Sequence, residues 1–390
     1  MKKWKGILAP ALLCCALLAC LSACGERQVV EDTINIAHIG PKTGSMAGWG
    51  LAEYNTLKLL VDEANASGGI AGRQVNLLTY DNRGDNVETQ NVAREAIQEG
   101  DAIAIIGTNT SATAIALSEV CGELGVPQIS TTSTNAKVTR ADDGSIRPYT
   151  FRICLSDPQL GEVMAQYAYQ TLGIATCATL YETGSDYSTG VTGDFVAAFE
   201  ACGGTVTAQE AYKTGDVDFR AQLIKINASG CEAIFMPLLY KELGISANQA
   251  RSLGLTQVFI GPDCWQVADL FTVVTDAVEG SYFVAPANLD DPLLAEFRAL
   301  YEETYGEDPA SVGQNAFFAY DAYLILKNAI EKADRITPAG IKNAIENETI
   351  SLEGLTGSIT MLPSHNPIRD AYIFTVENGE FVFVEKFSLN

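Results

Sequence analysis

Short apolar runs alternate with longer amphipathic stretches along the chain from Ile34 onward. The runs are rich in β-branched and aromatic residues, as buried β-strands are. They occupy residues 34–40, 74–80, 102–107, 126–130, 176–181, 204–212, 232–238, 256–261 and 279–286. Between them, residues 50–69, 86–100 and 111–125 have apolar positions at helical spacing, and each of these three stretches ends in glycine, as helices often do. Alternating strands and helices predict an α/β fold of parallel sheets covered by helices on both faces.

The alternation breaks and restarts near residues 141–163, which indicates a second domain. There a polar loop with Pro148 leads into a short strand, and Pro158 suits the first turn of a new helix. We expect the chain to cross between domains at residues 149–152, to cross back within residues 279–292, and to cross again in the strand-rich tail after Leu355. The prediction is two doubly wound, Rossmann-like domains joined by a three-segment hinge. The expected ranges are 33–150 with 285–357 for domain 1, and 151–284 with 358–390 for domain 2.

The first residues predict a targeting segment. Three lysines precede an apolar run, residues 7–21, that is too short to span a bilayer comfortably, so residues 1–23 are expected to be a signal peptide. The end of this segment, Leu-Ser-Ala-Cys, resembles the lipobox of bacterial lipoproteins. It predicts a lipidated Cys24 as the mature N-terminus, a linker over residues 24–32, and anchoring to a membrane outside the cytoplasm. An ordinary cleavage site with an incidental cysteine is the alternative.

Composition excludes several classes of partner. The formal net charge is −23, and no basic block offsets it, so nucleic acid and anionic lipid headgroups are poor partners. His38 and His365 are far apart and no CxxC pair follows Cys24, so neither a zinc site nor a cofactor is expected. The later cysteines sit mostly in apolar runs that favour small buried thiols, although a Cys202–Cys231 disulfide stays open in an oxidising compartment.

The glycine-rich loop at residues 37–50 follows the first expected strand, where a phosphate-binding loop would lie. Lys42 precedes Gly44 and no lysine follows, and the spacing of the glycines does not match a dinucleotide fingerprint. A nucleotide site is therefore not indicated. Trp49 in this loop either packs locally or forms one wall of a ligand pocket.

Two later loops, each after an expected strand, are rich in hydroxyl groups. The first contains Thr110 and Ser111, and the second contains four consecutive hydroxyl residues, Thr131 to Thr134. One such loop is an ordinary helix cap, but two on neighbouring strand ends predict a carboxylate clamp made of neutral donors and helix dipoles. Asp263 follows another strand and is either a helix cap or the counter-charge to a ligand ammonium. Together these groups describe a free α-amino acid.

With these motifs, the chain resembles the leucine/isoleucine/valine-binding type of periplasmic binding protein, the amino-acid-binding subunits of ABC importers. The resemblance covers nearly the whole mature chain, and its most specific stretch is residues 62–82, "DEANASGGIAGRQVNLLTYDN". Weaker landmarks follow in the family's order at residues 34–50, 104–114, 217–226, 258–263 and 319–326. It implies the type I periplasmic binding protein fold and a non-enzymatic role.

The resemblance also implies roles for particular residues. Ser111 and Thr134, with the backbone at Thr132, would hold the ligand carboxylate and amino groups, and Asp263 stands where the family commonly has an acidic partner for the ammonium. Four aromatic residues would line the side-chain pocket or its lid, or else pack in the ordinary way: Trp49, Tyr187, Tyr240 and Tyr320. The adjacent hydroxyl residues Thr110 and Ser133 complete the candidate set.

Two departures leave the identity of the amino acid open. Members that bind branched aliphatic amino acids often carry glutamate where Asp263 is one methylene shorter. Asn109 and Thr110 replace residues that are sometimes more apolar, which would make the pocket more polar.

The expected function is a monomeric, lipid-anchored receptor that captures a free amino acid, branched-chain or otherwise small, and docks on the permease of an ABC importer. Closure of the second domain on the ligand would require only a higher affinity of the ligand for the closed form. An enzyme is not favoured, since no HExxH, GxSxG or P-loop pattern is present. The alternative is a receptor of the same fold, for an amino acid, a short amide or urea, that signals to a membrane partner.

Overall fold

The structure is a computed structural model that describes residues 33–274, 276–347 and 351–387. The expected signal peptide, the lipidated Cys24 and the linker after it lie outside the described residues. None of the helices in the described ranges is both long enough and apolar enough to cross a membrane. The six cysteines within these ranges have free thiols, so Cys202 and Cys231 are not joined here.

A five-stranded parallel sheet in the order β2-β1-β3-β4-β5 forms the centre of the first domain. Its strands are β1 (Ile34–Gly40), β2 (Val75–Asp81), β3 (Ala104–Gly107), β4 (Gln128–Ser130) and β5 (Thr150–Arg152). Successive side chains of a strand point to opposite faces. Ile34 and Ile36 therefore join one apolar cluster, and Ala37 and Ile39 join the other.

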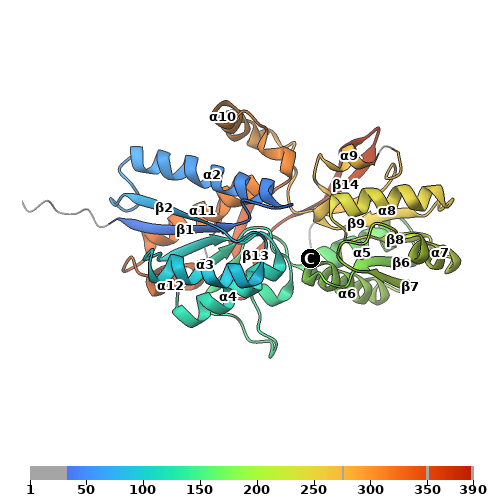
Figure 1. Cartoon of the computed structure of the whole chain (residues 1–390), viewed down its shortest axis with the longest axis horizontal. Helices are drawn as coiled ribbons and strands as arrows, with labels where there is room; N and C mark the ends of the chain where they lie inside the picture. Colours follow the sequence, from blue (N-terminus) through green and yellow to red (C-terminus); the bar gives the residue numbers. More distant parts are fainter. Residues whose placement is uncertain (1–32, 275, 348–350, 388–390) are drawn as a thin grey trace, which may run out of the picture. The chain divides into compact units, whose positions relative to one another are not determined.

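Helices cover both faces of this sheet, as the alternating pattern predicts (Figure 1). Helices α2 (Ala47–Ala66) and α11 (Asn315–Lys332) pack on one face, and α3 (Asn86–Gln98) and α4 (Ser111–Leu124) pack on the other. Helix α4 ends at Gly125, whose φ of 70° is the left-handed cap that the glycine ending predicts. Helices α10 (Ala295–Tyr305) and α12 (Pro338–Asn347) add to the side of α11.

The second domain is built on a seven-stranded sheet in the order β15-β14-β10-β9-β8-β6-β7. Five of its strands run parallel: β6 (Thr176–Glu182), β7 (Thr205–Tyr212), β8 (Ala233–Phe235), β9 (Val258–Gly261) and β10 (Tyr282–Ala285). One face carries α7 (Arg220–Ala228), α8 (Tyr240–Ser252) and α9 (Leu270–Val273), and the other carries α5 (Asp157–Gln166), the π-helical turn η2 (Tyr167–Thr171) and α6 (Asp186–Ala201). Pro158 lies in the first turn of α5, as expected.

The edge of this sheet differs from an all-parallel prediction. Strand β14 (Ala371–Glu377) pairs antiparallel with β10, and β15 (Glu380–Phe387) pairs antiparallel with β14. Asn378 and Gly379 form the turn between them with φ of 56° and 75°. Two positive φ values match the twist of a two-residue hairpin, and Asn-Gly is the dipeptide that adopts them most readily.

The chain passes between the two sheets three times, after β5, after β10, and between β13 and β14. A small antiparallel sheet of β11 (Ser351–Gly354), β12 (Gly357–Met361) and β13 (Pro367–Ile368) precedes the last passage. Ile359 and Met361 of this small sheet lie in the same apolar cluster as α2 and α11. The domain ranges given above stay a prediction at residue level.

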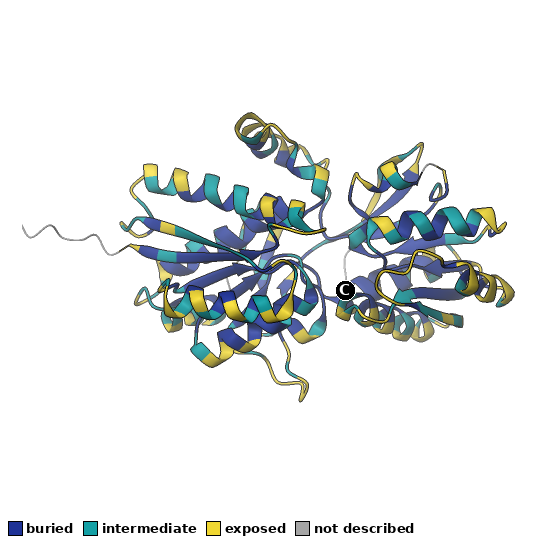
Figure 2. Cartoon of the chain, viewed as in Figure 1, coloured by how far each residue is buried: buried dark blue, intermediate teal, exposed yellow. Residues whose placement is uncertain are grey.

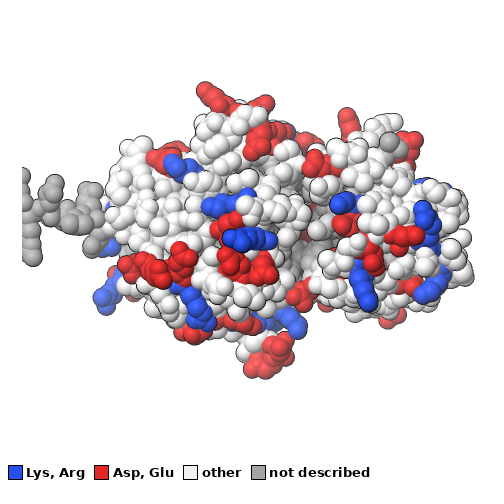
Figure 3. Space-filling view, viewed as in Figure 1, with Lys and Arg blue, Asp and Glu red and all other residues white. Residues whose placement is uncertain are grey.

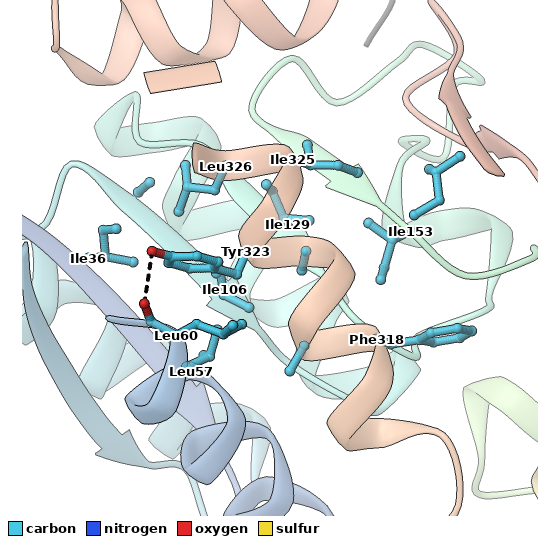
Figure 4. Packing of buried hydrophobic residues seen from close by; sticks show 14 of the residues in the cluster. Ile36, Leu57, Leu60, Ile106, Ile129, Ile153, Phe318, Tyr323, Ile325 and Leu326 are labelled. Carbon is cyan, nitrogen blue, oxygen red and sulfur yellow. Dashed lines mark hydrogen bonds between the residues drawn. The ribbon is translucent and has the colours of Figure 1, made fainter. Parts of the chain in front are cut away.

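Helix α11 lies at the centre of the first domain's larger apolar cluster (Figure 4). Phe318, Ile325 and Leu326 are fully buried on it, and the Tyr323 hydroxyl donates a hydrogen bond to the Leu60 carbonyl of α2 at 3.3 Å. Strands β3, β4, β5 and β8 are completely buried, whereas exposed residues gather on the outer faces of helices, in loops and on the edge strands β7 and β15 (Figure 2). Acidic and basic side chains are interspersed over the face seen in Figure 3.

A buried ion pair, Asp321 with Arg369, joins α11 to the third passage. The two charged groups lie 3.7 Å apart, and both side chains are almost completely buried. The Asp321 carboxylate also accepts hydrogen bonds from the backbone N–H groups of Leu355 and Thr356, at 2.5 and 3.2 Å. Arg369 donates to the Ile153 carbonyl, at 2.8 Å, in the first passage. One ion pair therefore fixes two of the three passages against the first domain.

We predict that Asp321→Ala destabilises the protein by about 3 to 5 kcal/mol, because it leaves the Arg369 guanidinium buried without a counter-charge. Urea unfolding followed by circular dichroism measures the loss. The matched control is Asp62→Ala, which removes an exposed ion pair with Lys58 on α2 and is expected to cost about 0.5 kcal/mol or less. Equal effects of the two substitutions would show that the buried pair does not hold the hinge segments.

Candidate functional site

A cavity of about 440 Å³ lies where loops from both sheets meet. Its lining comes from the loops that follow strands β1, β2, β3, β4, β6, β7, β8 and β9, and from the segment just before α11. The carboxyl ends of parallel strands are where ligands bind in open α/β sheets, and the volume lies in the usual range for small-molecule sites.

Six of the ten candidate ligand-binding residues line this cavity. Trp49 comes from the first turn of α2, Thr110 and Ser111 from the start of α4, and Thr132 from the loop after β4. Tyr187 in the first turn of α6 and Asp263 after β9 belong to the second domain. The structure thus brings together side chains that are more than 200 residues apart in the sequence, from Trp49 to Asp263.

The other four candidates lie outside the lining. Ser133 is buried and donates its hydroxyl to the Thr108 carbonyl, at 3.0 Å, and Thr134 is buried behind the loop. Tyr240 begins α8 and packs against the second domain's core. Tyr320 packs edge-on against Phe297, with ring centroids 5.2 Å apart, on the first domain's core.

The start of α4 presents unpaired donors to the cavity. Thr110 occupies the N-cap position, but its hydroxyl does not cap the helix and instead bonds to the Thr113 hydroxyl at 2.6 Å. The Ser111 hydroxyl accepts a hydrogen bond from the Asn135 N–H at 3.2 Å, which leaves its own hydrogen free to donate. The first N–H groups of a helix have no partner within it, and the helix dipole favours an anion there. This helix end can hold a carboxylate without a basic side chain.

A buried arginine that the sequence did not signal fixes the second hydroxyl-rich loop. The Arg152 guanidinium is fully buried and donates to the carbonyls of Ser133 and Asn135, at 3.1 and 2.8 Å, and to that of Thr134. Thr132 is held by the donation of its hydroxyl to the Asn109 carbonyl at 2.9 Å. The loop is thereby fixed from behind while Thr132 stays at the cavity wall.

Asp263 supplies a buried negative charge on the opposite side. Its carboxylate accepts hydrogen bonds from the Tyr187 hydroxyl at 2.8 Å and from the Gln314 amide at 3.0 Å. No lysine or arginine of the described ranges forms an ion pair with it. Burial raises the pKa of Asp263 to about 6, although the hydrogen bonds from Tyr187 and Gln314 favour the ionised form. The Asp263 carboxylate can therefore accept a positively charged group of a ligand.

Three amide side chains of the lining have unmet hydrogen-bonding capacity. Asn109 has no partner for either atom of its amide, and the carbonyl oxygens of Gln266 and Gln314 have none. All three side chains are more than nine-tenths buried. Buried polar groups are normally paired, so these atoms point to a polar occupant. Sequence analysis noted the polarity of Asn109 but missed both glutamines, because neither stands directly at the end of an expected strand.

Metal binding finds no support in the described ranges, where no three His, Cys, Asp or Glu side chains gather in a way that could hold an ion. His38 instead bonds to the buried Glu53 at 3.3 Å, and Glu53 accepts from the Thr131 hydroxyl at 2.5 Å. His365 contacts the carbonyls of Arg147 and Thr150.

The sequence also resembles those of known proteins. The sequence model of the family described as periplasmic binding protein matches residues 33–380. A leucine-, isoleucine-, valine-, threonine- and alanine-binding protein from Pseudomonas aeruginosa is 25% identical over 346 residues, covering 88% of this chain and 90% of that protein.

Solved structures extend the likeness to the whole fold. A leucine-binding protein, LivK, from Thermotoga maritima superposes with a TM-score of 0.82 at 29% identity, covering 91% of this chain and 99% of that one. The branched-chain amino-acid transporter substrate-binding protein LivJ from Streptococcus pneumoniae, solved with isoleucine, gives 0.79 at 28% identity, covering 90% and 99%.

The raised pKa of Asp263 predicts a specific pH dependence of stability. The folded protein holds this proton more tightly than the unfolded chain, so the contribution is complete below the ordinary pKa of 3.8 and is lost as the pH rises through about 6. Relative to Asp263→Asn, the ligand-free wild type should therefore lose about 3 kcal/mol of unfolding free energy between roughly pH 4 and pH 7.

Urea unfolding of both proteins at a series of pH values measures this difference. The control variant is Asp142→Asn, whose side chain is 85% exposed. A difference between wild type and Asp263→Asn that does not change with pH would mean that the carboxylate is ordinary and well solvated.

Proposed function

Because the chain belongs to the periplasmic binding protein family, a family of solute-binding proteins of transporters, we propose that it captures a free amino acid outside the cytoplasm. It would deliver this ligand to the permease subunits of an ABC importer. The observation that carries the proposal is the pairing, across one cavity, of a helix N-terminus with neutral hydroxyl donors and a buried carboxylate that has no cation.

The two sides of the cavity match the two charged groups of an amino acid. The ligand carboxylate would accept hydrogen bonds from the first N–H groups of α4 and from the Ser111 hydroxyl. The ligand ammonium would then bind Asp263, with the free carbonyl oxygens of Gln266 and Gln314 as further acceptors. Each charged end of the ligand would therefore meet a complementary group.

Domain closure follows from the origin of these groups. The carboxylate donors belong to the first sheet and Asp263 follows a strand of the second, so one ligand would bond to both domains. A ligand shifts an equilibrium only by its differential affinity for the two states. Since one ligand can bond to α4 and to Asp263 at the same time only while the domains are together, the closed form would be favoured on binding and would dock on the permease.

Anchoring to the membrane is part of the proposal. The lipobox-like residues before Cys24 support acylation of that cysteine. The protein would act as a monomer at the cell membrane. Coupling to a signalling partner instead of a permease, with an amino acid, a short amide or urea as ligand, is the alternative role of the same site.

A thermal-shift screen of the purified protein against the common amino acids, short amides and urea tests the function. An amino acid present at a hundred times its Kd is expected to stabilise the protein by about 2.7 kcal/mol, which raises Tm by several degrees. A short amide that stabilises the protein when no amino acid does would replace the proposed ligand class. The absence of a shift with every amino acid would refute amino-acid capture.

We predict that Asp263→Asn weakens binding of the amino acid found in the screen by about 2 to 5 kcal/mol, because one partner of a desolvated charge pair is lost. Ser111→Ala should cost less, about 1 to 3 kcal/mol, since it removes one neutral donor. Titration calorimetry measures both.

The control variant is Asp269→Asn, an exposed carboxylate six residues away that does not line the cavity. Affinity of Asp263→Asn equal to that of this control would rule out the ammonium contact.

A further inference from the structure

A second acidic group of residues lines the same cavity away from the amino-acid contacts assigned above. Glu182 ends β6, Tyr212 ends β7, Thr214 follows it, and Glu242 lies in the first turn of α8. We call these four residues the acidic subsite. All charged side chains of the lining are carboxylates, because Asp186 and Asp263 are the others and neither lysine nor arginine contributes.

Glu182 and Glu242 also have structural roles in the fold. The Glu182 carboxylate accepts a hydrogen bond from the Thr214 hydroxyl, and the Ser188 hydroxyl accepts from the Glu182 N–H at 3.0 Å. Glu242 suits the first turn of a helix, where the dipole favours a negative charge. Acidic residues alone therefore do not define a binding site.

Tyr212 is the observation that points to an occupant. Its side chain is 97% buried, since only 3% of its surface is exposed, and its ring packs edge-on against Phe219 with centroids 5.0 Å apart. The hydroxyl nevertheless forms no hydrogen bond to a side chain or backbone group of the described ranges, and Tyr212 lines the cavity. Burial raises the pKa of Tyr212, and the nearby carboxylates of Glu182 and Glu242 raise it further. Burial and these carboxylates therefore favour the neutral phenol.

An aliphatic side chain of the ligand would fit the acidic subsite poorly. It would bury the Tyr212 hydroxyl and displace water from Glu182 and Glu242 without offering any hydrogen bond. A positively charged group would pair with both carboxylates, donate to the phenol oxygen and reduce the repulsion between the acids. Sites that present unpaired polar groups discriminate strongly against analogues that lack the matching group.

We propose that the acidic subsite binds the positively charged side chain of a basic amino acid. The inference rests on the proposed function, because the subsite would act on a ligand whose α-carboxylate and α-ammonium are held by α4 and Asp263. It would select among amino acids, and the neutral side chains named for the relatives would be bound less tightly by this chain.

The test compares ligands of equal length that differ in charge. L-Lysine and L-norleucine share the same four-carbon side chain, and only lysine carries the terminal ammonium; L-ornithine and L-arginine cover shorter and longer cations. Titration calorimetry on the full mature chain is expected to show that at least one of the three basic amino acids binds about tenfold or more tightly than norleucine.

Variants then assign the selectivity to the subsite. Glu182→Gln, Glu242→Gln and Tyr212→Phe should each lower the ratio of basic to norleucine affinity, by roughly fivefold to fiftyfold for the two carboxylates. Glu200→Gln, which removes an exposed charge of α6 outside the cavity, should leave this ratio unchanged. The control separates a local contact from the general attraction of an acidic protein for cations.

The outcomes separate this inference from the function on which it rests. If norleucine or leucine binds and all three basic amino acids bind no more tightly, the acidic subsite is refuted and amino-acid capture stands. If no amino acid binds, amino-acid capture itself fails. Equal effects of Glu242→Gln and Glu200→Gln on the ratio would also overturn the subsite, without depending on whether Tyr212→Phe folds.

Discussion

A buried carboxylate without a cation is the constraint on which the site depends. Asp263 is 5% exposed and is stabilised by neutral donors, which are Tyr187, Gln314 and the backbone N–H groups at Asp263 and Cys264. Burying a charge is costly unless it is paired, so the ligand-free protein carries an unfavourable term that a bound ammonium removes. Gln314 precedes α11 of the first domain, whereas Asp263 follows β9 of the second. A ligand that pairs with this charge therefore acts at a contact between the two domains.

The cavity wall that contains Ser111, opposite Asp263, has no charged side chain, and the carboxylates of the cavity explain why. An arginine beside Ser111 would bind a carboxylate strongly, but in a small cavity with four acidic groups it would pair with one of them in the absence of ligand. A helix N-terminus supplies the positive potential without a mobile charge, because its donors are fixed in the backbone. Arg152 keeps the positive charge behind the loop, where it contacts carbonyls instead of the ligand space.

Local sequence signals predicted the strands, the helices around both sheets and the cavity-lining residues Trp49, Ser111 and Asp263, since these stand in loops directly after apolar strands. The sequence did not predict that Gln266 and Gln314 line the cavity. Their positions depend on how distant segments pack, and the neighbouring residues carry no signal of that packing. Tyr240 and Tyr320, by contrast, were candidates for the pocket wall but pack on the cores of the two domains. An aromatic residue suits a pocket wall and a core equally well, and only tertiary contacts decide between them. The antiparallel edge of the second sheet could have been predicted from the dipeptide Asn378-Gly379, which favours a hairpin turn, but not from the periodicity of apolar residues.

Motion between the domains must leave the ion pair of Asp321 and Arg369 intact. Arg369 lies in the third passage yet bonds to the Ile153 carbonyl of the first, so these two segments move together with α11. Separating either partner would leave a buried charge, which is strongly destabilising. The second passage is held differently, because the Gln266 amide donates to the Ala287 carbonyl at 3.2 Å and Arg298 donates to the Leu289 carbonyl at 3.0 Å. Because Gln266 also lines the cavity, a ligand that bonds to its free oxygen acts on a side chain that contacts the second passage.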